Sequence, residues 1–151
     1  MIVTKKISIL SKIYFLIFMI FFLFIYNNLK AQLHKTIDSL QAIEQNCLDS
    51  GMHMENCSCE FSHEMDSILN IVYSNVRTNL NTQQKEAFKQ EELIWLKKRE
   101  INHEESRKES IKEGLHGSDV GMIACNDDAE FVIDRINAII KKWDFKKIYS
   151  N

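Results

Sequence analysis

The sequence of 151 residues has no proline and only four glycines, all of them between Gly51 and Gly121. A β-sandwich or β-barrel needs many more turn residues than this, so the scarcity excludes both classes. Collagen-like, proline-rich and low-complexity proteins are excluded for the same reason. With 45% hydrophobic and 26% charged residues, the composition is typical of a folded globular domain and not of a disordered chain.

The sequence also lacks the short motifs that mark common active sites. It has no glycine-rich phosphate loop, no Gly-x-Ser-x-Gly elbow and no His-Glu-x-x-His pair. No nucleophile and base can be paired from their spacing. The adjacent carboxylates Asp127 and Asp128 fall at an expected helix start, where we interpret them as a cap and as partners of the helix dipole. We therefore predict that the protein is not an enzyme and uses no cofactor.

The N-terminal segment has the pattern of an export signal. Three lysines precede an uncharged run over residues 13–26, which is followed by the small residue Ala31. A run of 14 residues is shorter than the roughly 20 that a bilayer span needs. We predict a secretory signal peptide over residues 1–31, cleaved after Ala31, with an uncleaved membrane anchor as the alternative. Both interpretations place residues 32–151 outside the cytosol.

The exported part carries a net negative charge. Residues 32–151 hold 15 basic and 21 acidic residues, a net charge of −6. This balance argues against nucleic acid or anionic lipid as a partner and permits a basic protein partner. A mildly acidic surface also simply keeps a protein in solution. We expect contact with a membrane only through the N-terminal segment, if it stays attached.

Four cysteines indicate a disulfide framework. An even number of cysteines in an exported domain of this size predicts two disulfides among Cys47, Cys57, Cys59 and Cys125. A bond between Cys57 and Cys59 would close a small strained ring and is the least favourable. Two pairings remain open: 47–57 with 59–125, or 47–59 with 57–125.

One stretch of sequence also fits a metal site. In the run HMENCSCEFSH, the residues His53, Cys57, Cys59 and His63 could supply thiolate and imidazole ligands to zinc or copper. Export favours oxidised cysteines, however, and this arrangement would leave the other two cysteines unpaired. The disulfide interpretation is therefore the one we prefer.

The apolar residues of the exported part recur at helical spacing throughout. Four segments show such a stripe, and each stripe is identified by its apolar members: Leu33, Ile37, Leu40 and Ile43; Phe61, Met65, Ile68, Leu69, Val72, Tyr73, Val76 and Leu80; Phe88 and Trp95, with Ala87, Ile94 and Ile101 beside them; and Val132, Ile133, Ile136, Ile139, Ile140 and Trp143. The sequence therefore predicts an all-α fold, a small disulfide-stapled bundle of about four helices after the signal segment.

Polar residues mark the expected helix ends. Asn81 with Gln84 three residues later is the pattern of a capping box at the start of the third helix. Three glycines between Gly114 and Gly121 predict a loop. Asp127, with Glu130 three residues later, predicts the start of the fourth helix.

An ordered set of short motifs resembles a known family. Met54 precedes Cys57 by three residues. A second motif combines Asp66 with Leu69, Asn70 and Tyr73, and a third pairs Trp95 with Arg99. In this order, and flanked by cysteines, the motifs resemble the N-terminal domain of the lysozyme inhibitor LprI family over about residues 45–140. The resemblance implies an exported all-helical domain, periplasmic or secreted, that binds a protein partner, namely lysozyme.

The sequence departs from the family pattern at several positions. The family's cysteine after the Trp–Arg motif falls at His103, its glutamine before the tryptophan falls at Glu92, and its aspartate after the arginine falls at Glu100. Cys59 is an additional cysteine. We expect that Cys59 replaces the missing thiol as the partner of Cys125.

The matching residues have both a structural and a binding interpretation. Asp66, Asn70 and Tyr73 share one face of the second helix, and Trp95 and Arg99 share one face of the third. An ion pair between Asp66 and Arg99 would fix the register of the two helices. Direct contact with a partner is the alternative role.

The function that we prefer is a protein-binding module of the cell envelope, and the alternatives are the metal-binding protein described above and an accessory domain. A lysozyme inhibitor could place the loop between Gly114 and Gly121 over the carboxylate-lined cleft of its target, with His116 and Ser118 as hydrogen-bond donors. Of the two interpretations of this loop, we favour a plain connection between helices. The domain could also be an accessory module that binds another protein of the cell envelope.

Overall fold

The computed structural model describes residues 31–143, and this part of the chain is all-α. One helix covers residues 31–49, and it is followed by α2 (Met54–Thr78), α3 (Thr82–Lys112) and α4 (Ser118–Lys142). The expected fold class, a disulfide-stapled bundle of four helices, is confirmed. Residues 1–30, which carry most of the expected signal segment, and residues 144–151 lie outside the described residues. Over residues 31–143, no helix has the length and apolar character of a membrane span.

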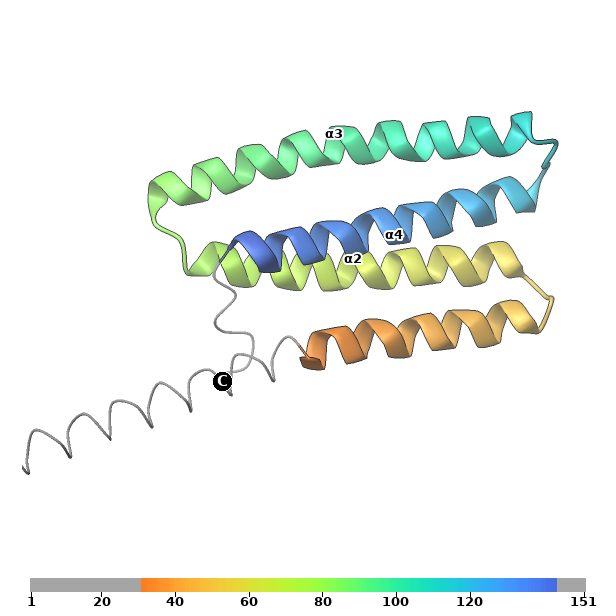
Figure 1. Cartoon of the computed structure of the whole chain (residues 1–151), viewed down its shortest axis with the longest axis horizontal. Helices are drawn as coiled ribbons and strands as arrows, with labels where there is room; N and C mark the ends of the chain where they lie inside the picture. The colour runs from red at the N-terminus through yellow and green to blue at the C-terminus, as the bar shows by residue number, and fades with distance from the viewer. Residues whose placement is uncertain (1–30, 144–151) are drawn as a thin grey trace, which may run out of the picture. The chain divides into compact units, whose positions relative to one another are not determined.

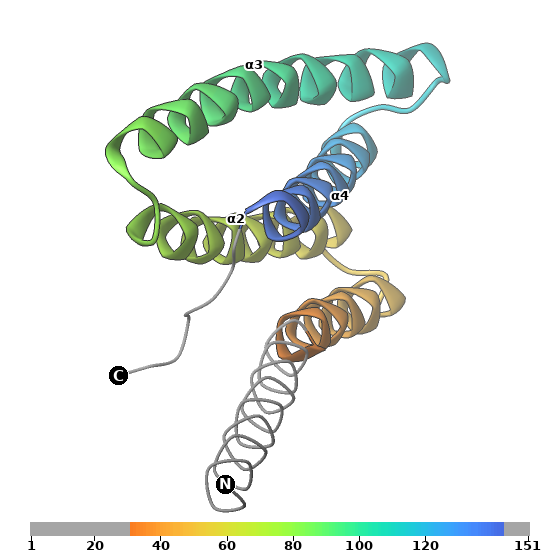
Figure 2. The ribbon, with the colours of Figure 1, turned by 60° about the vertical axis from the view of Figure 1, so that its left-hand side comes forward.

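The chain divides into two compact units, Met1–Asp38 and Ser39–Asn151, and the second holds the helical core. In this unit α4 lies between α2 and α3 and contacts both (Figure 1, Figure 2). α2 and α4 run in the same direction, and α3 runs opposite to them (Figure 1). α4 therefore supplies the packing surface that positions α2 and α3 on either side of it.

The core follows the second and fourth apolar stripes. Its fully buried side chains come from α2, α3 and α4 and include Met65, Val72, Val76, Phe88, Val132, Ile136 and Ile139. The Phe88 ring packs against two other aromatic rings. Its centroid lies 4.6 Å from the centroid of the Tyr73 ring and 5.0 Å from that of the Trp143 ring. Removing apolar surface of this extent from water is the main stabilising contribution to such a bundle.

The burial predicted for the first and third apolar stripes is only partly correct. Ile43, Ile94 and Ile101 are 62%, 58% and 57% exposed. On the same two helices Glu44 and Glu92 turn toward the interior instead, because each has a hydrogen-bond donor there. Ion pairs and hydrogen bonds thus replace apolar packing at these positions.

The start of α3 agrees with the sequence pattern. The Asn81 Oδ1 atom accepts a hydrogen bond from the Gln84 backbone N–H at 2.9 Å. The Gln84 Oε1 atom accepts one from the Asn81 N–H at 3.0 Å. The expected capping box is therefore confirmed.

The start of α4 was predicted wrongly. The helix begins at Ser118 and not at Asp127, so the loop spans only residues 113–117. Gly117, with φ of 61°, precedes the first turn. Gly121 lies inside the helix, where a Cβ atom would overlap the carboxylate of Glu55. This glycine therefore marks a close approach between α2 and α4 rather than a loop.

Two disulfides cross-link the helices. Cys47 pairs with Cys57, and Cys59 pairs with Cys125, which is the first of the two open pairings. The first bond joins the helix of residues 31–49 to α2, and the second joins α2 to α4. The additional Cys59 is thus the partner of Cys125, as expected from the departure at His103.

The disulfides also decide against the metal site. Both Cys57 and Cys59 are bonded to other cysteines, so the set with His53 and His63 has no thiolate to offer. Among residues 31–143, no group of three or more potential ligands is placed to hold a metal ion.

Candidate functional site

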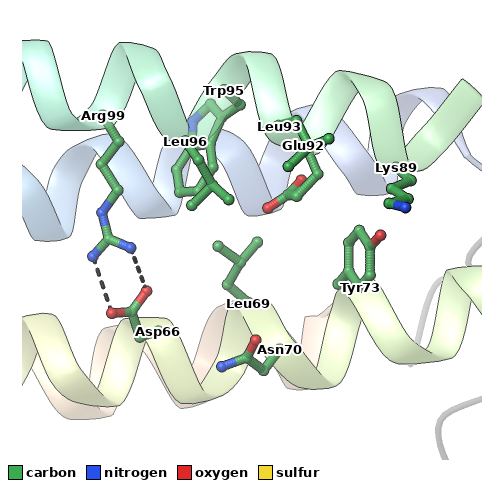
Figure 3. A pocket seen from close by; sticks show the side chains of 10 residues that line it. All are labelled: Asp66, Leu69, Asn70, Tyr73, Lys89, Glu92, Leu93, Trp95, Leu96 and Arg99. Atoms are coloured by element: carbon green, nitrogen blue, oxygen red, sulfur yellow. Dashed lines mark hydrogen bonds and ion pairs between the residues drawn. The ribbon is translucent and has the colours of Figure 1, made fainter.

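The residues of the family motifs converge on one cleft between α2 and α3. The cleft has a volume of about 300 Å³. It is lined from α2 by Asp66, Leu69, Asn70 and Tyr73 and from α3 by Lys89, Glu92, Leu93, Trp95, Leu96 and Arg99 (Figure 3). Six of these ten residues are the ones that the sequence motifs single out. Their i, i+4 and i+7 spacing brings them to facing sides of the two helices.

One end of the cleft is closed by a three-helix ion network centred on Arg99 of α3. Its guanidinium donates to both carboxylate oxygens of Asp66 in α2, at 2.7 and 3.0 Å (Figure 3). It also donates to both oxygens of Asp128 in α4, at 2.7 and 2.6 Å. Ser62 of α2 donates a further hydrogen bond to Asp128 at 2.8 Å. The expected pair of Asp66 and Arg99 is present, and Asp128 is a third member that the sequence pattern did not reveal.

Asp128 and its neighbour were therefore interpreted wrongly as helix caps. They lie in the middle of α4, where Asp128 is buried and Asp127 accepts a hydrogen bond from the Ser106 hydroxyl of α3 at 2.6 Å. Burial alone would raise the pKa of Asp128. The hydrogen bonds from Arg99 and Ser62 outweigh it, so the pKa of Asp128 lies below its ordinary value of 3.8. The hydrogen bond to Asp128 raises the pKa of Arg99, and the hydrogen bond to Asp66 raises it further.

The middle of the cleft is built around Trp95. This side chain is only 9% exposed and stacks on Phe131 of α4, with ring centroids 5.8 Å apart. The guanidinium carbons of Arg99 and Arg135 lie 5.5 and 5.8 Å from the Trp95 ring, within cation–π range. Arg135 in turn donates to the Glu92 carboxylate at 2.7 and 3.0 Å. The glutamate that departs from the family pattern thus joins α3 to α4.

The other end of the cleft is aromatic. Tyr73 stacks on Phe88 and is partly buried. Burial, followed by the nearby carboxylate of Glu92, raises the pKa of the Tyr73 hydroxyl. The phenol is therefore neutral at physiological pH and can donate a hydrogen bond.

The rim of the cleft remains open to solvent. Leu93 and Leu96 of α3 are 44% and 46% exposed, although both line the cleft. Asn70 of α2 is exposed on the opposite side. The site thus combines exposed apolar groups, an amide and a phenol around a rigid ion network. Exposed apolar groups beside hydrogen-bonding groups are common at protein interfaces.

With this geometry described, comparison with known families is informative. The family described as lysozyme inhibitor LprI matches residues 44–138. The chain belongs to the lysozyme inhibitor LprI family. Comparison with curated proteins and with solved structures finds no match. Because the matched range contains the whole α2–α3 cleft and both disulfides, the family assignment covers the described core and not a peripheral segment.

Membership in the LprI family bears on the kind of function. The family is one of inhibitors and not of enzymes. It therefore suggests a protein-binding module of the lysozyme-inhibitor type, with a protein as its partner. The recognition of this family from three short motifs is confirmed.

The expected binding loop lies away from the ion network. His116 is exposed in the loop of residues 113–117, whereas Ser118 is the first residue of α4. Gly114 and Gly117, with φ of 92° and 61°, shape this loop. The loop connects the C-terminal end of α3 to the N-terminal end of α4 (Figure 1).

Proposed function

We propose that this protein is an exported module of the cell envelope that binds a lysozyme and inhibits it by occluding its substrate cleft. The observation that carries the proposal is the match of the LprI family over residues 44–138. Two disulfides support a location in the periplasm or outside the cell, because such bonds persist in oxidising compartments. The N-terminal pattern of residues 1–31 supports the same location.

The loop of residues 113–117 is the element that we propose enters the lysozyme cleft. A lysozyme cleft contains two catalytic carboxyl groups. His116 is exposed in this loop and can donate a hydrogen bond to a carboxylate, and Ser118 offers a hydroxyl at the adjoining first turn of α4. Gly114 and Gly117 turn the chain within the five residues of this loop, and a short connection of this kind is what we propose enters the cleft.

A lysozyme assay tests the function and the loop together. The rate of peptidoglycan hydrolysis by several lysozymes is measured with and without the purified, oxidised protein. We expect slower turnover of at least one lysozyme and co-elution of the two proteins. We also expect His116→Ala to weaken inhibition, while His34→Ala, at another exposed histidine, leaves it unchanged. Unchanged turnover of every lysozyme, without co-elution, would contradict the proposed function.

The α2–α3 cleft favours a second candidate, an accessory module that binds another envelope protein. The supporting observation is that Leu93 and Leu96 are exposed within a cleft that also holds the motif residues. Such apolar groups next to polar ones are common at protein interfaces. If Leu93→Ser with Leu96→Ser leaves lysozyme inhibition intact but abolishes capture of a different envelope protein, this second function is supported.

A further inference from the structure

A second groove lies on the opposite side of α2, between this helix and residues 39–49. Its volume is about 370 Å³. Phe61, which is 4% exposed, forms an apolar part of its wall, and Ile43 stands beside it with 62% of its surface exposed. The Cys47–Cys57 disulfide also lines the groove, so the two helices that form it are covalently joined. We call this feature the acidic groove because of the groups described next.

The acidic groove carries three carboxylates and neither a lysine nor an arginine among its lining residues. Glu60 and Glu64 are exposed one helical turn apart on α2, and Glu44 comes from the facing helix. His63 is a further polar lining residue. The rim is therefore negative at neutral pH, in contrast to the α2–α3 cleft, where Arg99 and Lys89 accompany the acids.

Glu44 differs from the other two carboxylates of the groove because it is buried. It is only 8% exposed, and its Oε1 atom accepts a hydrogen bond from the Ser58 hydroxyl at 2.9 Å. Its second oxygen is not among the buried side-chain atoms of residues 31–143 that lack a partner. Glu130 of α4 adds a like charge nearby. Burial, opposed by the hydrogen bond from Ser58 and assisted by Glu130, raises the pKa of Glu44, and a cation bound in the groove would favour its charged form.

We propose that the acidic groove binds the side chain of a lysine or arginine from a basic protein partner. The apolar stem of such a side chain fits the surface of Ile43 and Phe61, and its charged head meets the carboxylates of Glu44, Glu60 and Glu64. This inference rests on the proposed function, in which the partner is a lysozyme, and adds that the partner presents a basic side chain to the groove. The groove then supplies attraction and orientation, while the loop with His116 supplies occlusion.

Two double variants with equal change of charge test this assignment. Glu60→Gln with Glu64→Gln removes two charges from the acidic groove. Glu105→Gln with Glu109→Gln removes two charges from an exposed face of α3 and is the control. Titration calorimetry against a basic c-type lysozyme measures each dissociation constant. We expect the groove variant to bind about tenfold more weakly and the control to change by about twofold or less, since only the groove charges contact the partner.

A third variant separates contact from general electrostatics. Ile43→Ser leaves every charge in place, and the side chain is already exposed, so folding is little affected. We expect binding to weaken several-fold because the stem of the bound side chain loses its apolar support. Equal losses in the groove variant and the control, or unchanged binding in both the groove variant and Ile43→Ser, would overturn the proposal.

A peptide arm keeps the test independent of lysozyme. If the wild-type protein binds no lysozyme, the proposed function fails, and the groove is judged with a short peptide containing two arginines. Nuclear magnetic resonance shifts at Ile43, Phe61 and Glu64 upon titration, absent in the groove variant, would support the assignment. Shifts spread over the whole acidic surface, or none at millimolar peptide, would overturn it.

Discussion

Replacing Arg99 with methionine should destabilise the protein more than replacing either of its carboxylate partners with the corresponding amide. Methionine keeps an unbranched side chain and a similar helix propensity, so the change removes mainly the guanidinium group with its charge and hydrogen bonds. Arg99 joins α2, α3 and α4 through four hydrogen bonds to Asp66 and Asp128. Without Arg99, the Asp128 side chain, which is 13% exposed, keeps only the hydrogen bond from the Ser62 hydroxyl.

The magnitude follows from how far each group is buried. Breaking a fully buried ion pair from one side costs about 3–5 kcal/mol. Arg99 retains 18% exposure of its side chain, so we expect about 2–4 kcal/mol for Arg99→Met. Asp66 is 36% exposed and screened by water, so Asp66→Asn should cost about 1 kcal/mol or less. Asp128→Asn should fall between the two.

Urea unfolding of the oxidised protein, followed by circular dichroism, measures these differences at pH 7 and at pH 3. The pKa of Asp128 is lowered by folding, so its contribution is complete above its unfolded value near 3.8 and is lost as the pH falls below it. The gap between wild type and Arg99→Met should therefore shrink at pH 3. A cost below about 1 kcal/mol at pH 7, or an equal cost for Asp66→Asn, would refute the reasoning.

Three further changes give separate tests by the same unfolding assay. Removing the Cys59–Cys125 disulfide, which spans 66 residues, should lower the free energy of unfolding by about 4 kcal/mol. Removing the Cys47–Cys57 disulfide, which spans 10 residues, should lower it by about 3 kcal/mol. The reverse order would contradict the chain-entropy argument. Asn81→Ala should cost about 1 kcal/mol through loss of the capping box, and no change would mean that water replaces it fully. Glu44→Gln should stabilise the protein at pH 7. Burial raises the pKa of Glu44, the hydrogen bond from Ser58 opposes this shift and Glu130 adds to it. The charged form of Glu44 is therefore disfavoured in the folded state. This gain should vanish on acidification as the wild-type carboxyl becomes protonated, and a loss of stability at pH 7 would contradict the sign.

The features that depend on local pattern were predictable from the sequence. The long stripe of α2 and the Asn81 cap each need only spacing along one helix, and both are present in the structure. The cysteine count predicted two disulfides but not their pairing. The choice between two partners depends on the direction in which each cysteine leaves its helix, which the composition of the chain does not contain.

The features that depend on neighbouring helices were not predictable. Gly121 has the sequence character of a loop, yet it lies inside α4, where the approach of Glu55 leaves no room for a side chain. Asp128 has the character of a cap, yet it accepts two hydrogen bonds from Arg99, which is 29 residues away in the chain. The apolar stripes predicted that isoleucines of the first and third helices point inward, whereas Glu44 and Glu92 of these helices do so. In each of these cases a tertiary contact outweighs a local preference.

The positions of Cys57 and Cys59 constrain how the molecule matures. Two residues along an α-helix turn the side-chain direction by about 200°, so these thiols leave α2 on nearly opposite sides. Exchanging their partners would require α2 to rotate by about half a revolution, which would turn Met65 and Val72 out into solvent. Scrambled isomers should therefore unfold easily, bind chaperones and be recognised by disulfide isomerases. Secretion yield in strains lacking such an isomerase would then report directly on the spacing of these two cysteines.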